Sequence, residues 1–288
     1  MQGPSGFAAW VRSRVVPSGT RLAEEARERV FQRRWAGSEP RDEELQKIAD
    51  EFFCDLVDTE YQVYLDYEDQ CIAKAIPIAL TKEAAHRYPA TVHMVRSAVD
   101  AIAQSEVPVT ERLTRAVHIL RPFFKLFEQS LAQGRMTRAG GSAQQHFEYL
   151  LVRLGYAGQF ETQRVLNGKV DFLFPSSTAW TIDRQRCIIL SVKRSLRERY
   201  KQVFEELGIT GGLSVYLLVT QTLDEARKDL TTSKIDQLSN QNIYLVVRDV
   251  VKNTLFPTAH RVLGLTQFLF RELPVRQQIW QSLLEEMS

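Results

Sequence analysis

The chain has 288 residues, of which 44% are hydrophobic and 25% are charged, as in an ordinary globular protein of one large or two modest domains. No apolar run approaches the ~18 residues of a membrane span, and the N-terminus lacks the apolar segment of a signal peptide. Three cysteines without paired spacing (Cys54, Cys71 and Cys187) argue against a disulfide framework and a cysteine-ligated zinc site. We therefore expect a cytoplasmic protein without a membrane partner.

Charge is unevenly distributed along the chain. The formal net charge is only +2, yet residues 184–201 hold seven basic residues and one acidic residue, Glu198, a local net charge of +6. The remainder of the chain is therefore slightly acidic. Such a concentration of positive charge predicts an anionic ligand at this segment.

Residues 1–130 are predicted to be helical. In residues 43–59, Leu45, Ile48, Phe52 and Leu56 recur at helical spacing. Residues 110–131 carry a coiled-coil-like series, which Pro122 is expected to kink or divide. The members of that series are Leu113, Val117, Leu120, Phe124, Phe127 and Leu131. Loops are predicted at residues 36–40, 87–90 and 105–108.

The pattern changes after residue 133. Residues 133–141, "QGRMTRAGG", are predicted to be a connector, followed by a helix over 142–156 that Ser142 and Gln145 cap, with His146 on its surface and Gly155 ending it. Strands are predicted at 169–174, 187–193, 212–220 and 242–249, with a helix over 198–208. This order predicts an α/β core with a mixed central sheet flanked by helices. We expect a helical region at 1–130, for dimerisation and DNA contacts, and a catalytic and recognition domain at 131–288.

Two neighbouring predicted strands carry residues suited to phosphodiester hydrolysis. Asp171 lies in the first strand, and Lys193 ends the second, with Ser191 on the same face. An acid on one strand and S-x-K on the next is the spacing of the PD-(D/E)xK nuclease core. A carboxylate there binds Mg²⁺, and a lysine orients water or stabilises the charge that develops on the phosphate. The same spacing also arises by chance in α/β proteins.

Two further features fit the same chemistry. Glu206, thirteen residues after Lys193, supplies a second carboxylate. Arg197 and Arg199 can each donate two hydrogen bonds to guanine, and Glu198 can accept one from the cytosine amino group. The alternative for Glu206 is a solvated surface position. The alternative for residues 197–199 is an exposed helix start, at which the charge of Glu198 interacts favourably with the helix dipole.

The segments "RAGGSAQQHFEYLL", "VDFLFPS" and "VKRSLRERYKQVFEE" resemble the catalytic domain of the EcoRII group of type II restriction endonucleases, which includes PspGI. The resemblance covers about residues 130–210 and implies a restriction-endonuclease-like fold. It implies that Asp171 and Glu206 are metal ligands and Lys193 the catalytic lysine. It further implies that Arg197, Glu198 and Arg199 read C·G pairs and that Gln133 contacts the outer C·G pair.

One position departs from the group. Its members have a glutamate eleven residues after the glutamine that corresponds to Gln133, whereas this chain has Gln144. Glu148 lies one helical turn further along the same face. Either Gln144 replaces the acid as a neutral ligand or Glu148 reaches the site. The proline of "PD" is also replaced, by Val170.

The resemblance implies a Mg²⁺-dependent enzyme that cuts both strands of double-stranded DNA. The expected site is a palindrome with CC and GG half-sites (CCNGG, CCWGG or a CCGG core), and the expected products carry 5′-phosphates. A palindrome calls for a homodimer or a higher homo-oligomer. A cognate methyltransferase is expected in the host. The alternatives are a non-cleaving DNA-binding protein on the same fold and a protein whose N-terminal helices are the main interaction module.

Overall fold

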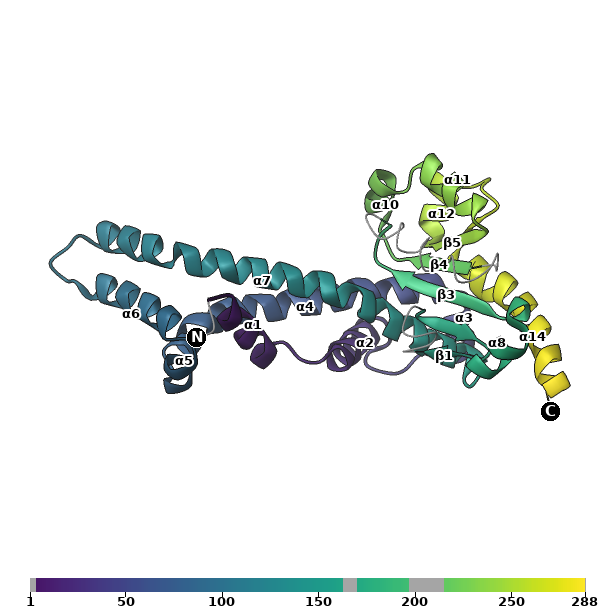
Figure 1. Cartoon of the computed structure of the whole chain (residues 1–288), viewed down its shortest axis with the longest axis horizontal. Coiled ribbons are helices and arrows are strands. Elements are labelled where there is room, and N and C mark those ends of the chain that lie inside the picture. The colour runs from purple at the N-terminus through teal and green to yellow at the C-terminus, as the bar shows by residue number, and fades with distance from the viewer. Residues whose placement is uncertain (1–3, 163–169, 197–214, 288) are drawn as a thin grey trace. The chain divides into compact units, whose positions relative to one another are not determined.

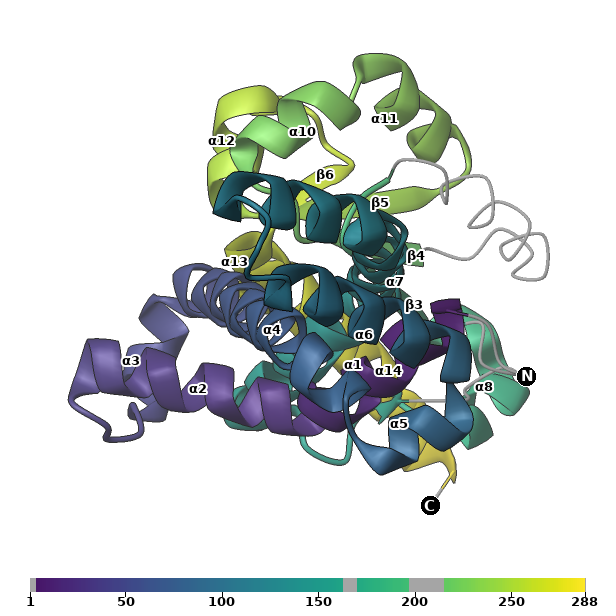
Figure 2. The same cartoon turned by 90° about the vertical axis from the view of Figure 1, so that its left-hand side faces the viewer.

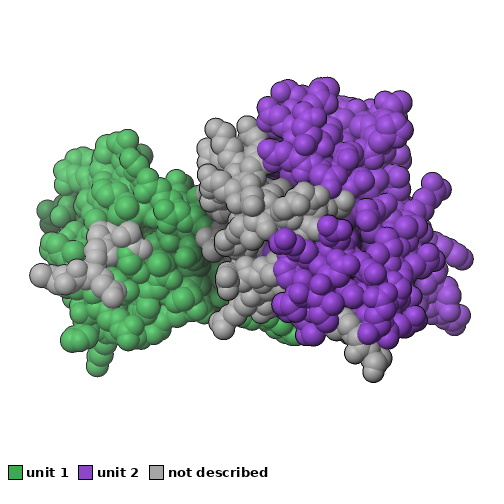
Figure 3. Space-filling model, turned by 45° about the vertical axis from the view of Figure 1, so that its right-hand side comes forward, with its two compact units in different colours: residues 1–26, 59–138 green, residues 27–58, 139–288 purple. Residues whose placement is uncertain are grey.

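The computed structural model describes residues 4–162, 170–196 and 215–287. The chain forms two compact units, coloured separately in Figure 3. Unit 1 comprises residues 1–26 and 59–138, and unit 2 comprises residues 27–58 and 139–288. Residues 27–58 therefore share a unit with the C-terminal part of the chain. The expected roles of residues 1–130 and 131–288 remain predictions.

Unit 1 is helical and has its own aromatic core. The ring of Phe7 packs against the rings of Tyr88 and Phe123, and Phe123 packs against Phe127. All four side chains are buried. Figure 1 shows α6 and the first part of α7 as a hairpin joined by the predicted loop at residues 105–108. The helices that lie in or enter this unit are α1 Pro4–Val15, α2 Gly19–Trp35, α4 Ala49–Ala79, α5 Lys82–Arg87, α6 Pro89–Ala103 and α7 Val109–Leu151.

Helix α7 corrects two expectations. It continues through the expected connector at 133–141 and past the capping pattern of Ser142 and Gln145, and Pro122 lies inside it without dividing it. A glycine costs a helix only about 1 kcal/mol, which burial of neighbouring apolar residues offsets. Gly134 lies in close packing, because a Cβ atom there would lie 2.5 Å from the Tyr64 hydroxyl and would force a neighbouring side chain to shift. Glycine therefore marks a close contact here and does not mark a loop.

The coiled-coil-like series on α7 divides into two groups. Leu120, Phe127 and Leu131 are buried, as a core-facing helix requires. Leu113, Val117 and Phe124 are 51%, 66% and 37% exposed. Together with the exposed Val109, they form an apolar stripe along one side of α7.

The described residues of unit 2 form a six-stranded sheet in the order β1-β2-β3-β4-β5-β6. The pairs β1–β2 and β2–β3 are antiparallel, and the pairs from β3 to β6 are parallel. The predicted mixed sheet is therefore confirmed, and two short strands, β1 and β6, are added. The strands are β1 Glu161–Thr162, β2 Phe172–Phe174, β3 Ile188–Lys193, β4 Val215–Val219, β5 Ile243–Val247 and β6 Val262–Gly264.

Helices cover both faces of this sheet. Phe172, Leu190 and Tyr216 share a core with Phe147 of α7 and Phe52 of α4. On the other face, Leu217 and Leu245 share a core with α10, α11 and α12, which Figures 1 and 2 show together on one side of β4 and β5. The remaining elements are α3 Asp42–Lys47, η1 Val152–Tyr156, α8 Ser177–Asp183, η3 Arg184–Arg186, α10 Leu223–Asp229, α11 Thr232–Asn240, α12 Asp249–Leu255, α13 Leu265–Gln267, η4 Phe268–Glu272 and α14 Leu273–Met287.

Two further details of unit 2 concern the sequence predictions. Gly155 adopts φ +89°, the left-handed conformation expected of a glycine that ends a helix. His146 is fully buried, which contradicts the expected surface position. Its helix packs against the sheet on a wider face than the apolar residues alone indicated. Among the described residues, no helix has the length and apolar character that crossing a membrane requires.

Candidate active site

Asp171 and Lys193 meet where β2 begins and β3 ends. The Lys193 ammonium donates to Asp171 Oδ2 at 3.1 Å, and the Val192 backbone N–H donates to the same oxygen at 2.7 Å. The two side chains are 24% and 22% exposed, so solvent and a ligand can reach them. Among the described residues, Asp171 Oδ1 accepts no hydrogen bond. Oδ2 is thus occupied by the lysine and by the Val192 N–H, and Oδ1 has no hydrogen-bond donor within the part of the chain that the structure describes.

The antiparallel register of β2 and β3 produces this contact. Phe172 pairs with Leu190, so Asp171, the residue before β2, comes opposite Ser191. Side chains of Ser191 and Lys193 lie on one face, because they are two residues apart in a strand. Asp171 and Lys193 therefore lie at neighbouring positions of the paired strands β2 and β3, as expected.

The neighbouring helix α7 brings Gln144 to the same place. The Gln144 amide donates to the Asp171 backbone carbonyl at 3.3 Å. Glu148, one turn further, is hydrogen-bonded to the Thr162 hydroxyl of β1, and burial raises the pKa of its carboxyl above the usual range. Of the two alternatives, Gln144 is the residue that contacts Asp171.

Some predicted site residues cannot be placed beside this pair. Arg197, Glu198, Arg199 and Glu206 lie outside the described residues. Gln133 lies on α7 in unit 1 with an exposed side chain. The roles assigned to these residues remain predictions.

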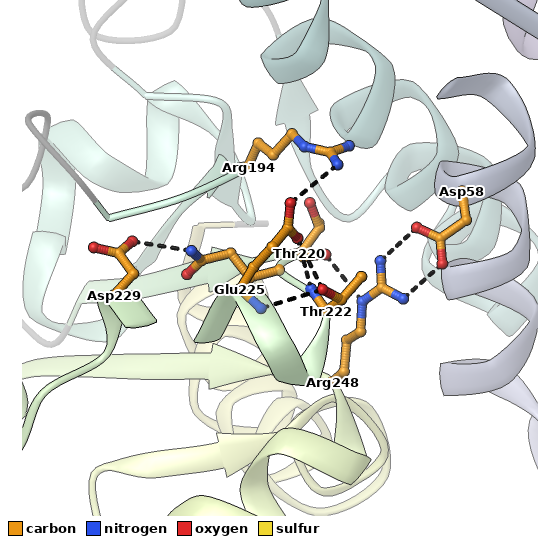
Figure 4. Close-up of polar contacts among 8 residues, drawn as sticks. Asp58, Arg194, Thr220, Thr222, Glu225, Asp229 and Arg248 are labelled. Atoms are coloured by element: carbon orange, nitrogen blue, oxygen red, sulfur yellow. Dashed lines mark hydrogen bonds and ion pairs between the residues drawn. The ribbon is translucent and has the colours of Figure 1, made fainter. Parts of the chain in front are cut away.

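Lys193 and the residues after it make polar contacts with the end of β4 and with α10. The Thr220 N–H donates to the Lys193 carbonyl at 3.2 Å, next to β4. The Arg194 guanidinium lies 3.5 Å from the Glu225 carboxylate, as Figure 4 shows. The Leu196 N–H donates to Asp229 Oδ2 at 3.0 Å.

Two acids of α10 receive these contacts: Glu225 pairs with Arg194, and Asp229 accepts from the Leu196 N–H. Glu225 also accepts from the Thr222 N–H at 2.9 Å in a capping box. Burial opposes ionisation of Glu225, but Thr222 and Arg194 outweigh it, and the pKa of Glu225 is lowered. Neither acid was predicted to be part of the site. A detectable signal was Asp229 itself, since an acid in the last turn of a helix opposes the helix dipole.

An ion pair anchors the neighbouring end of β4 to α4. Arg248 donates to both Asp58 oxygens at 2.7 Å, and its Nε donates to the Thr220 carbonyl at 2.9 Å (Figure 4). Burial opposes the charge of Arg248, but the hydrogen bonds to Asp58 outweigh it and raise the pKa of Arg248. Thr220 is thereby held from both sides, by Lys193 and by Arg248.

The donor set at Asp171 suits a hard divalent cation. The open Asp171 Oδ1 is a carboxylate oxygen, and Mg²⁺ is commonly held by one or two carboxylates together with substrate phosphate and water. Within the described part of the chain, no group of three His, Cys, Asp or Glu side chains forms a complete metal site. The second predicted carboxylate, Glu206, lies outside that part. Asp171 therefore fits Mg²⁺ as one carboxylate ligand of a site that further ligands would complete.

Comparison with known proteins identifies a family that matches this chain. The family described as "EcoRII C terminal" matches residues 103–269, more than half of the chain. The type II restriction enzyme SsoII of Shigella sonnei is 30% identical over 148 residues, which are 49% of this chain and 47% of SsoII. EcoRII of Escherichia coli is 33% identical over 90 residues, which are 29% of this chain and 22% of EcoRII. The matches thus span about half or less of these relatives.

Solved structures share the fold. Metal-depleted Ecl18kI in complex with uncleaved DNA superposes with a TM-score of 0.72 at 15% identity, over 96% of this chain and 85% of that chain. The PspGI complex with substrate DNA gives a TM-score of 0.55 at 16% identity, over 93% and 94%. The predicted restriction-endonuclease-like fold is therefore confirmed.

Proposed function

Since the chain belongs to the EcoRII C-terminal family, we propose that it is a type II restriction endonuclease that hydrolyses both strands of duplex DNA. The observation that carries the proposal is the meeting of Asp171 and Lys193 on adjacent strands, with Asp171 Oδ1 open. The structure-matched relatives, Ecl18kI and PspGI, are described in complexes with DNA. The related SsoII and EcoRII are named type II restriction enzymes.

The residues present divide the chemistry between them. Asp171 would hold Mg²⁺, and Glu206 would be the second carboxylate ligand. When bound, Mg²⁺ neutralises the phosphate and acidifies the attacking water. The Lys193 ammonium, oriented by Asp171 Oδ2, donates to the phosphate oxygens as negative charge develops there. Water attacks in line, the 3′ oxygen leaves, and the product retains a 5′-phosphate.

Gln144 is proposed as the neutral residue that supports Asp171. Its hydrogen bond to the Asp171 carbonyl fixes the backbone from which the metal-binding carboxylate extends. Glu148, with its raised pKa and its Thr162 partner, serves as a nearby second candidate.

Sequence recognition is proposed for the basic segment that follows Lys193. Arg197 and Arg199 would each donate two hydrogen bonds to guanine, and Glu198 would accept from cytosine. Gln133 would contact the outer C·G pair. These contacts predict CC and GG half-sites within a palindrome, with a CCNGG, CCWGG or CCGG core.

A homodimer is proposed because a palindrome presents the same contacts twice, related by a two-fold axis. The apolar stripe on α7 (Val109, Leu113, Val117 and Phe124) is the surface that we assign to the second copy. Exposed apolar side chains at spacings of four, four and seven residues lie on one side of a helix and match the contact surface of a helix pair. A host that carries such an enzyme in its cytoplasm needs a methyltransferase to protect its own DNA.

The direct test incubates the purified protein with supercoiled plasmid and Mg²⁺ and sequences the DNA ends. The proposal expects linear products with 5′-phosphates at one palindromic sequence that contains CC and GG. An intact plasmid together with a sequence-specific shift in gel mobility would support a non-cleaving DNA-binding protein.

A further inference from the structure

The buried carboxylate of Asp229 joins three segments of unit 2. Its side chain is 5% exposed. Oδ2 accepts from the Leu196 N–H at 3.0 Å and from the Gln221 amide at 3.0 Å. Oδ1 accepts from the Lys234 ammonium at 2.6 Å. The carboxylate therefore ties the chain after β3 to the chain after β4 and to α11, and Figure 4 shows it beside the end of β4.

The position of Asp229 is unfavourable for its own helix. It is the last residue of α10, where the partial negative charge of the helix end repels a carboxylate. Burial adds a desolvation cost. Lys234 offsets part of both effects, yet an apolar residue would avoid them. What the carboxylate alone provides is a pair of oxygens that can accept from all three donors at once.

Leu196 is the residue that this arrangement fixes most directly. Its N–H is held by Asp229, and its side chain is 1% exposed in a core with Leu217, Val219 and Ala226. It is the residue immediately before Arg197, the first of the proposed base readers. Base-edge hydrogen bonds need donor–acceptor distances within a few tenths of an ångström. The start of the reading segment must therefore be fixed relative to Lys193 and the scissile phosphate.

We propose that Asp229 is a positioning residue for sequence recognition, which holds Leu196 so that the reading segment begins at a defined place beside the catalytic lysine. The inference rests on the proposed function and extends it. Asp229 acts through its hydrogen bond with the Leu196 backbone and not through a contact with DNA.

The test is Asp229→Asn, measured by binding to cognate and unrelated duplexes in Ca²⁺. An asparagine offers one oxygen, so its amino group must face either the Lys234 ammonium or the N–H donors of Leu196 and Gln221. We expect cognate affinity to fall by about 5- to 150-fold, the effect of a disturbed base contact, with unchanged affinity for unrelated DNA. The matched control is Asp236→Asn at an exposed position of α11, which should leave both affinities unchanged.

A double-mutant cycle with Arg199→Ala separates positioning from general stabilisation. If Asp229 acts through the readers, Asp229→Asn adds little to the loss already caused by Arg199→Ala. Fully additive losses, or equal losses on cognate and unrelated DNA, would overturn the inference. Wild-type protein that neither cuts nor discriminates DNA would instead overturn the proposed function.

A second variant covers the case in which Asp229→Asn does not fold at the assay temperature. Asp229→Asn combined with Lys234→Met removes the ammonium, so the asparagine oxygen is free to accept from Leu196. Discrimination between cognate and unrelated DNA should then return toward the wild-type ratio. A folded double variant that binds all duplexes alike would contradict the assignment, and circular dichroism provides the folding check.

Discussion

Lys193 Nζ lies 3.1 Å from Asp171 Oδ2, although the two residues are 22 positions apart in the chain. The antiparallel pairing of β2 with β3 creates the contact, and the Val192 N–H holds the same carboxylate oxygen. The two side chains are therefore already paired, and the second carboxylate oxygen has no donor among the residues that the structure describes. This arrangement determines how changes at either residue should affect cleavage.

Asp171→Asn should abolish cleavage while leaving the fold and DNA binding in Ca²⁺ intact. The asparagine oxygen can still accept from the Val192 N–H, but the charge that we propose binds Mg²⁺ is lost. Plasmid cleavage and gel shifts provide the measurements. The control, Asp224→Asn, changes a carboxylate that is 85% exposed and should cut normally. Wild-type cutting by Asp171→Asn would remove Asp171 from the metal site.

Lys193→Met should reduce the single-turnover cleavage rate by roughly 10²–10³-fold, the loss of one charged donor to the reacting phosphate. Cognate DNA binding should change much less, because Lys193 acts on charge that develops during the reaction. Rapid-quench kinetics at saturating enzyme measure the step. An equal loss in binding and rate would make Lys193 a general phosphate contact.

Gln144→Ala should slow cleavage more than Glu148→Gln does. Gln144 contacts the Asp171 backbone, whereas the partner seen for Glu148 is the Thr162 hydroxyl of β1. Both variants lie on the same face of α7, which makes them a matched pair. The opposite order in single-turnover rates would show that Glu148 reaches the reaction site.

Val117→Arg should convert the proposed dimer to monomers. Val117 is 66% exposed in the middle of the α7 stripe. In the proposed dimer this position would be covered by the second copy, and burying an unpaired arginine charge there is costly. Analytical ultracentrifugation across a concentration series measures the change. Ile72→Arg, at an exposed apolar position of α4 in the same unit, is the control and should remain dimeric. A dimer that survives Val117→Arg would place the interface elsewhere.

Asp50→Asn should stabilise the protein above pH 6. Burial, together with the charge of Asp249, raises the pKa of Asp50 from 3.8 to about 6. Because the folded state holds this proton more tightly than the unfolded state, the contribution of Asp50 to stability falls as the pH rises from about 4 through 6. The amide keeps the acceptor for the Asp249 N–H without the charge.

Urea unfolding at pH 4 and pH 8 measures this effect. The gain should be about 1–3 kcal/mol at pH 8 and close to zero at pH 4. Asp58→Asn is the contrasting variant, because it removes one partner of Arg248 and should destabilise at pH 8. A gain that is equal at both pH values would show that the charge of Asp50 is not its source.

Local sequence patterns predicted the elements whose formation depends on nearby residues. The apolar runs that became β3 and β5 were found, and so was the helical stop at Gly155, because strand and cap preferences act over a few residues. The strands β1 and β6 were missed, since two or three residues carry no periodicity. The connector expected at 133–141 was wrong because the close packing around Gly134 depends on side chains that are distant in the chain.

By itself, the sequence predicted the chemical composition of the proposed site: an acid and a lysine at strand spacing, then a basic segment, then a second acid. Only the tertiary structure decided which partners these residues have. The strand register brought Lys193 into contact with Asp171. Helix packing brought Gln144, and not Glu148, to the Asp171 backbone. Asp229 connected Leu196 to α10. Such contacts join segments that are far apart in the chain, and their geometry follows from how helices and sheet pack together, which no local pattern records.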